Sequence, residues 1–113
     1  MQIIDKITLA ELFKMSERMF DDFVKAVVDI STEDFAIDAD LHADLEKILI
    51  EKGSKSDDLW GINLYPKFYD TDNFIEFDSM INLKPMLGNR TRSVENKNIQ
   101  KRIIEIVNKK VIK

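Results

Sequence analysis

The sequence contains no cysteine and only one histidine. The lack of cysteine excludes disulfide bonds, thiolate metal ligands and cysteine nucleophiles. One histidine cannot build a histidine-rich metal site. No segment approaches the roughly 18 apolar residues of a membrane span, and residues 1–13 lack the basic start and continuous apolar run of a signal peptide. We therefore expect a cytoplasmic protein that makes no contact with a membrane.

Glycine and proline are also scarce, with three and two residues in a chain of 113. The segment 59–92 holds both prolines, two of the glycines, the only tryptophan and both tyrosines. The length fits one domain, 1–113. The 44% apolar and 34% charged residues are typical of a globular chain. A functional site is expected first in the segment 59–92.

The net charge of −4 conceals an uneven distribution of charged residues. Residues 1–83 contain 8 Lys or Arg and 19 Asp or Glu, whereas residues 84–113 contain 9 and 2. An acidic body and a basic end can neutralise each other within the fold or attract each other between the subunits of a homodimer. Alternatively, the basic end is a patch for an anionic partner. The sequence leaves these three alternatives open.

Capping signals predict three helices. Thr8 and Glu11 form a capping box that opens the first helix, which is predicted to run to about Phe20 or Asp21. The other two helices are predicted over 41–52, with Asp40 as N-cap and Gly53 at the end, and after Asn96 as N-cap.

Four segments rich in β-branched and aromatic residues predict strands over 24–30, 35–39, 59–65 and 73–83. The element order is then α-β-β-α-β-β-α. Short connections within each strand pair favour antiparallel hairpins, and the apolar helix faces need a sheet to cover. We predict an α+β fold with an antiparallel sheet of about four strands and helices packed on one face. The pairing between the two hairpins is left open.

The predicted ligand-binding segment is the loop 84–92, KPMLGNRTR. Arginines at positions i and i+2 of an extended loop project to the same side, and their forked donors suit carboxylate or phosphate groups. The alternative is that these arginines pair with acids of the body. The loop is neither a phosphate loop nor a dinucleotide fingerprint, and we expect no cofactor. The predicted ligand-binding residues are Lys84, Asn89, Arg90, Arg92 and the preceding Asn82.

A different candidate site is the sheet face opposite the core, where strand alternation places several carboxylates. Such oxygen ligands bind Mg²⁺ or Mn²⁺. The predicted metal ligands are Asp29, Asp38, Glu76 and Asp78, and the catalytic candidates are His42 and Asp78. The structural alternative is that antiparallel sheets often present a polar face to water. A histidine in a first helical turn also commonly serves as a structural hydrogen-bonding group.

Nucleic acid and membrane surfaces are not expected as partners. The whole chain is acidic, with a pI near 5.0, and the basic segment 84–113 contains no aromatic residue for stacking on bases. The apolar stripe of the last helix is needed for the core and is not free for a membrane surface.

Four strings of residues together resemble a family of small prokaryotic proteins known only as a domain of unknown function. They are LHAD at 41–44, LWGINLYP at 59–66, EFDSMIN at 76–82 and the pattern P-x-x-GN-x-(S/T)R-x-V at 85–94. Similar sequences tend to have Arg at Lys84 and Asp-Pro at Asn96 and Lys97. The resemblance implies a cytoplasmic single-domain protein and brings no activity, substrate or catalytic residues.

The sequence therefore favours a non-catalytic binding or interaction domain that recognises an anionic ligand or an acidic partner through the loop 84–92. A homodimer is compatible with its charge distribution. The alternative from a different class is a metal-dependent hydrolase or nuclease that uses the carboxylate-rich sheet face.

Overall fold

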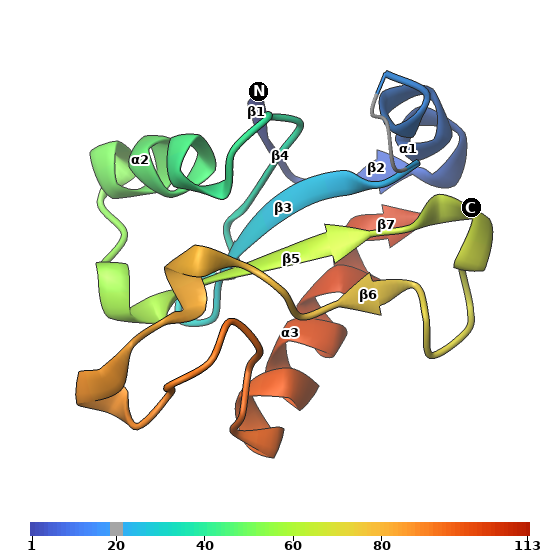
Figure 1. Ribbon diagram of the computed structural model, residues 1–113. Helices are drawn as coiled ribbons and strands as arrows, with labels where there is room; N and C mark the ends of the chain where they lie inside the picture. Colours follow the sequence, from blue (N-terminus) through green and yellow to red (C-terminus); the bar gives the residue numbers. More distant parts are fainter. Residues whose placement is uncertain (19–21) are drawn as a thin grey trace.

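The computed structural model describes residues 1–18 and 22–113 and is built around a five-stranded sheet (Figure 1). Every pair of neighbouring strands in this sheet is antiparallel. In spatial order the strands are β1 (Gln2–Ile4), β4 (Phe35–Ile37), β3 (Val24–Asp29), β5 (Leu59–Leu64) and β6 (Ile75–Glu76). A separate parallel pair joins β2 (Ile7–Thr8) to β7 (Val111–Ile112). The α+β class predicted from the sequence is confirmed.

The two long central strands, β3 and β5, form the middle of the sheet. They pair along their whole length, from Val24 opposite Leu64 to Asp29 opposite Leu59. Both are rich in residues that fit a pleated, buried surface. The predicted strands 24–30, 35–39 and 59–65 correspond to β3, β4 and β5. The pairing of β3 with β5 is the connection between hairpins that the sequence left open.

Helices cover both faces of the sheet, which corrects the prediction of helices on one face (Figure 1). On one face, α1 (Leu9–Ser16) and α3 (Lys97–Lys110) pack over alternate residues of β3 and β5. This larger core includes Val24, Ala26, Val28, Trp60, Ile62, Leu64, Ile103, Ile106 and Val107. On the other face, α2 (His42–Lys52) packs on a smaller cluster, which comprises Val27, Ala36, Leu45, Leu49 and Leu59. Strands covered on both sides carry apolar residues at nearly every position, so their alternation does not show how many faces are covered.

The first helix begins as the sequence predicts. The backbone N–H of Glu11 donates to Thr8 Oγ1 at 3.1 Å, and Glu11 Oε1 accepts from the backbone N–H of Thr8 at 3.2 Å. The helix ends at Ser16, earlier than predicted. The predicted end near Phe20 or Asp21 lies outside the described residues.

The second helix starts differently from the prediction, because its N-cap is Leu41 and not Asp40. No side chain caps its first N–H groups. Gly53 ends the helix with a φ of 123°, a conformation that favours glycine. The third helix begins at the predicted Asn96, whose Oδ1 accepts from two backbone N–H groups of the first turn. Within the part of the chain that the structure describes, none of the helices has the length and apolar character that crossing a membrane requires.

The predicted strand over 73–83 is wrong along most of its length. Only Ile75 and Glu76 pair with β5. The chain then forms a 3₁₀ turn at Met80–Asn82, and the Asn82 side chain occupies the edge of β5. Its Oδ1 accepts from the N–H of Gly61 at 2.8 Å, and its Nδ2 donates to the carbonyl of Gly61 at 3.0 Å. A side-chain amide thus replaces a strand backbone at this point.

Candidate functional site

A cleft of about 530 Å³ lies on the α2 side of the sheet, between the first turn of α2 and the residues of β5 and β6. Its size lies within the roughly 300–1,000 Å³ of small-molecule sites. The polar lining comprises Lys25, His42, Asn63, Tyr65, Glu76, Asp78, Ser79 and Arg92. The apolar lining comprises Phe23, Leu41, Ala43, Met80 and Ile81.

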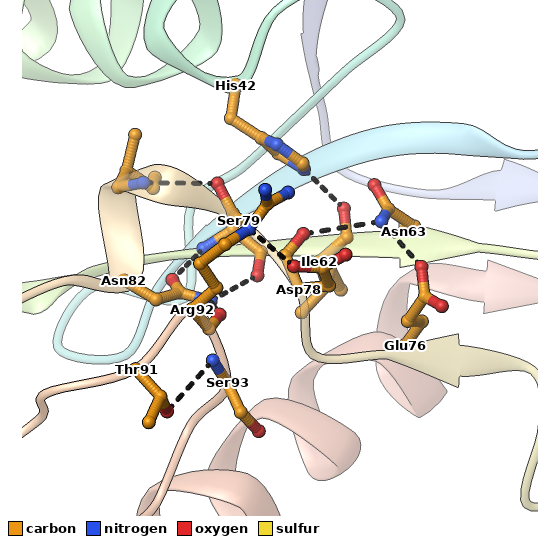
Figure 2. Close-up of polar contacts among 12 residues, drawn as sticks. His42, Ile62, Asn63, Glu76, Asp78, Ser79, Asn82, Thr91, Arg92 and Ser93 are labelled. Carbon is orange, nitrogen blue, oxygen red and sulfur yellow. Dashed lines mark hydrogen bonds and ion pairs between the residues drawn. The ribbon is translucent and has the colours of Figure 1, made fainter.

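Polar contacts link the two ends of this cleft through one residue, Asp78 (Figure 2). At one end, Asn63 Nδ2 donates to Glu76 Oε1 at 2.8 Å and to the backbone carbonyl of Asp78 at 3.3 Å. The Tyr65 hydroxyl donates to the same Glu76 oxygen at 3.2 Å. At the other end, Arg92 Nε lies 2.8 Å from Asp78 Oδ1. Asn63 and Arg92 therefore contact the same residue, one at its backbone carbonyl and the other at its carboxylate.

The amide oxygen of Asn63 is buried and has no hydrogen-bond partner within the described chain. The orientation of the amide is fixed, because Nδ2 donates to two oxygen acceptors and a flipped amide would place two acceptors together. The side chain is only 5% exposed. In Figure 2 its oxygen lies on the side that faces His42. A buried acceptor without a partner costs about 1–3 kcal/mol, and a donor that reaches it recovers this energy.

His42 lines the cleft in its neutral form. Its Nε2 donates to the backbone carbonyl of Ile62 at 2.8 Å. Burial lowers the pKa of His42 below its ordinary value near 6.5, and the hydrogen bond to Ile62 only partly offsets this effect. Because a carbonyl only accepts, Nε2 carries the proton and Nδ1 is left as an acceptor. The predicted catalytic pair of His42 and Asp78 does line one cleft, but no hydrogen bond joins the two side chains within the described residues.

Asn82 and Asn89, two of the predicted ligand-binding residues, have structural roles. Asn82 is fully buried and bonds to Gly61, and its Nδ2 also donates to the carbonyl of Arg92 at 2.9 Å. Asn89 Nδ2 donates to the carbonyls of Asn82 and Ser93, each at 2.7 Å, and its Oδ1 accepts from the N–H of Glu95. The polar groups of both side chains are used to hold the loop against the sheet.

Lys84 and Arg90 do not line the cleft. Lys84 is buried, its Nζ donates to the carbonyl of Ser56 at 3.0 Å, and it lies 5.3 Å from the centre of the Trp60 ring. Burial lowers the pKa of Lys84, while Glu46 and other acids nearby act in the opposite direction. Arg90 is exposed. Of the five predicted ligand-binding residues, the structure therefore places only Arg92 at the cleft.

The four predicted metal ligands do not form one site. Glu76 and Asp78 line the cleft, whereas Asp29 accepts hydrogen bonds from Ser54 and from the turn at Ser31, and Asp38 pairs with Arg18 at 2.7 Å. Burial alone would raise the pKa of Asp29, but these hydrogen bonds keep that pKa below its ordinary value. Among the residues that the structure describes, no group of three or more His, Asp or Glu side chains is arranged to hold a metal ion.

Comparison with protein families matches residues 1–110 to the family described as "Protein of unknown function (DUF5674)". The chain belongs to this family. No curated protein and no solved structure matches the chain.

In this DUF5674 chain, all four strings that carry the family resemblance contribute to the cleft. The string at 41–44 forms the first turn of α2 and supplies His42, and the string at 59–66 contains β5 and supplies Asn63. The strings at 76–82 and 85–94 supply Asp78 and Arg92. The departure at Lys84 lies outside the cleft, so it does not alter the lining.

Sequence reasoning missed Lys25 as a residue of the site. It lies in β3 directly across the ladder from Asn63, on the α2 side of the sheet. Its ammonium lies 4.5 Å from the centre of the Phe23 ring, which also lines the cleft. The available signal was a lysine within the otherwise apolar run 24–28, and it acquires meaning only once β3 is known to pair with β5.

Proposed function

We propose that this domain binds a small anionic molecule in the cleft, with Arg92 as the residue that contacts the anionic group. An anion-binding function is also what the sequence favours. Within the loop 84–92, however, only Arg92 lines the cleft. Lys84 and Asn89 of the loop are occupied by structural contacts, and Arg90 is exposed outside the cleft.

The observation that carries the proposal is the state of the Arg92 guanidinium. Asp78 holds it at the cleft through Nε, and the side chain remains 54% exposed. No other hydrogen bond or ion pair to this guanidinium is present among residues 1–18 and 22–113. Its terminal nitrogens are therefore oriented donors that remain available, and this arrangement suits a carboxylate or phosphate.

Two further features favour a negative group at this place. The first turn of α2 lines the cleft, and its N-terminus has no side-chain cap. A helix N-terminus presents free N–H groups and a partial positive charge. Lys25 adds a second cation to the cleft wall. These features act in the same direction as Arg92.

The test is thermal unfolding of the protein with a panel of phosphates and carboxylates, in the native chain and in Arg92→Ala. A compound at about 100 times its dissociation constant adds about 2.7 kcal/mol, which is several degrees in a domain of this size. The shift should be lost in Arg92→Ala. This variant should still fold, because an exposed ion pair contributes only about 0–1 kcal/mol.

Arg90→Ala is the matched control, because it removes the same charge from the same loop outside the cleft. It should keep the ligand shift of the native chain. An anion that stabilises Arg92→Ala and the native chain equally would contradict the proposal. The absence of any shift with small anions would leave an acidic protein partner or a second copy of the chain as the alternative.

A further inference from the structure

The charges on the cleft wall are balanced. Lys25 and Arg92 are cations, Glu76 and Asp78 are anions, and His42 is neutral at pH 7 because burial lowers its pKa. The two cations would attract a ligand that carries only negative charge, and the two anions would repel it. A ligand with both charges complements the whole cleft.

The negative end of the cleft offers acceptors to a donor group. Asn63 Oδ1 is buried without a partner, and Lys25, its neighbour across the ladder, lies over the Phe23 ring and does not donate to it. Glu76 accepts two hydrogen bonds through Oε1, and its Oε2 makes no hydrogen bond within the described residues. An ammonium group on the His42 side of the amide would satisfy Asn63 Oδ1, and the Glu76 carboxylate, which accepts from Nδ2 of the same amide, adds negative charge nearby.

The two ends lie close enough for one small molecule, since Asn63 and Arg92 contact the same residue, Asp78. Beside them the wall is apolar and partly exposed, with Leu41 at 59% and Met80 at 62% exposure. The cleft therefore combines a cationic end, an acceptor end and an apolar wall within a volume of about 530 Å³.

We infer that the ligand is an α-amino acid with an apolar side chain. Its carboxylate binds Arg92, its ammonium group donates to Asn63 Oδ1 with the Glu76 carboxylate nearby, and its side chain contacts Leu41 and Met80. This inference rests on the proposed anion site and adds the amine and the apolar group to it.

The experiment is calorimetric titration of the native protein with three probes: leucine, N-acetylleucine and leucinamide. N-acetylleucine keeps the carboxylate and lacks the ammonium, and leucinamide keeps the ammonium and lacks the carboxylate. Leucine should bind at least about tenfold more tightly than either, because each probe lacks one of the two charged groups that the cleft complements.

The variant Glu76→Gln tests the amine end. It keeps an oxygen acceptor for Asn63 and Tyr65 and removes only the charge, so the fold should be retained. The preference for leucine over N-acetylleucine should fall, while N-acetylleucine binding should be unchanged or improved. Glu51→Gln, an exposed position on α2 outside the cleft, is the matched control and should keep the native preference.

The outcomes separate the two proposals. If N-acetylleucine or inorganic phosphate binds as tightly as leucine and requires Arg92, the amino-acid inference fails and the anion site stands. If leucine binding persists in Arg92→Ala, the inferred orientation fails. If none of the carboxylates or phosphates binds to the native protein, both proposals fail.

Discussion

At the scale of single residues, the cleft depends on a close contact between a glycine and two polar side chains. A Cβ added at Gly61 would lie 2.6 Å from Ser79 and 3.1 Å from the ring of His42. The lack of a side chain at Gly61 therefore allows the first turn of α2 and the turn at Met80–Asn82 to approach the same strand. His42 is held in this contact by the carbonyl of Ile62, with its Nδ1 free of hydrogen bonds among the described residues.

The neutral state of His42 makes stability depend on pH. The pKa is lowered on folding by burial, so below about pH 6.5 the unfolded chain binds a proton that the folded chain does not. Above that pH the free energy of unfolding has its full value with respect to this residue. It decreases as the pH falls from about 6.5 toward the lower pKa of His42 in the folded state. Between about pH 7.5 and pH 5, the melting temperature of the native protein should decrease more than that of His42→Gln.

His42→Gln is a suitable comparison because glutamine stays neutral and its amide can still donate to Ile62. The carboxylates titrate alike in both proteins and cancel in the difference. Parallel curves of melting temperature against pH for the two proteins would show that His42 is not held neutral by the fold.

At the scale of elements, the side chain of Asn82 substitutes for a strand. It satisfies both backbone groups of Gly61 at the edge of β5, where a regular neighbour would have supplied backbone groups. Asn89 then fixes the following loop to Asn82 through its carbonyl at 2.7 Å. The segment that carries Arg92 is therefore positioned by two buried amides.

Asn82→Ala should destabilise the protein by several kcal/mol. It leaves the buried N–H and carbonyl of Gly61 without partners, at about 1–3 kcal/mol for each group. Denaturant unfolding measures this loss. Asn73→Ala, at an exposed position, is the matched control and should change stability by less than about 0.5 kcal/mol. If Asn82→Ala kept native stability and lost only the ligand shift, Asn82 would be a ligand-binding residue, as the sequence first predicted.

The sequence predicts those elements whose signals are local. The capping box of Thr8 and Glu11, the N-cap Asn96 and the strands β3, β4 and β5 follow from neighbouring residues. The short strands β1, β2 and β7 were missed, because they exist only through pairing with distant segments. The segment 73–83 alternates like a strand, yet its pattern cannot show that a side chain and not the backbone completes the edge of β5.

The candidate site was predictable only in part, for the same reason. Arg92 stands out together with Arg90 as a forked donor in the loop that contains Gly88, and Glu76 and Asp78 stand out as carboxylates on one sheet face. Their combination with Lys25 and Asn63 depends on the pairing of β3 with β5. The sequence also predicts Asn89 as a ligand-binding residue because its amide can donate hydrogen bonds. It does not show that backbone groups of the same loop already use this amide.

At the scale of the whole molecule, the basic C-terminal segment pairs with the acidic body. Arg102 and Lys109 both contact Glu33, at 2.9 and 3.1 Å, and Lys110 lies 3.7 Å from Asp5. Hydrogen bonds from Lys109 and Arg102 lower the pKa of Glu33. Part of the charge asymmetry of the sequence is therefore neutralised within the fold.

Salt should weaken this attraction between the two charged regions. The screening length falls from about 10 Å at 0.1 M to about 3 Å at 1 M salt. The melting temperature of the native protein should respond less favourably to added sodium chloride than that of Glu33→Gln, in which Lys109 and Arg102 no longer face the Glu33 carboxylate. Glu51→Gln removes an equal charge outside these pairs and should behave like the native protein. A native response in Glu33→Gln would show that these pairs do not contribute.

The order of the strands along the chain has a consequence for how the protein is made. Residues 2–64 supply β1, β4, β3 and β5, the greater part of the sheet, together with α1 and α2. The helix α3, which covers much of the larger core, begins only at Lys97. During synthesis from the N-terminus, α2 can cover its face of the sheet early. Trp60 and its apolar neighbours are buried only after α3 has been synthesised. The parallel pair of β2 with β7 then closes a loop of almost the entire chain, at an entropic cost that grows only slowly with loop length.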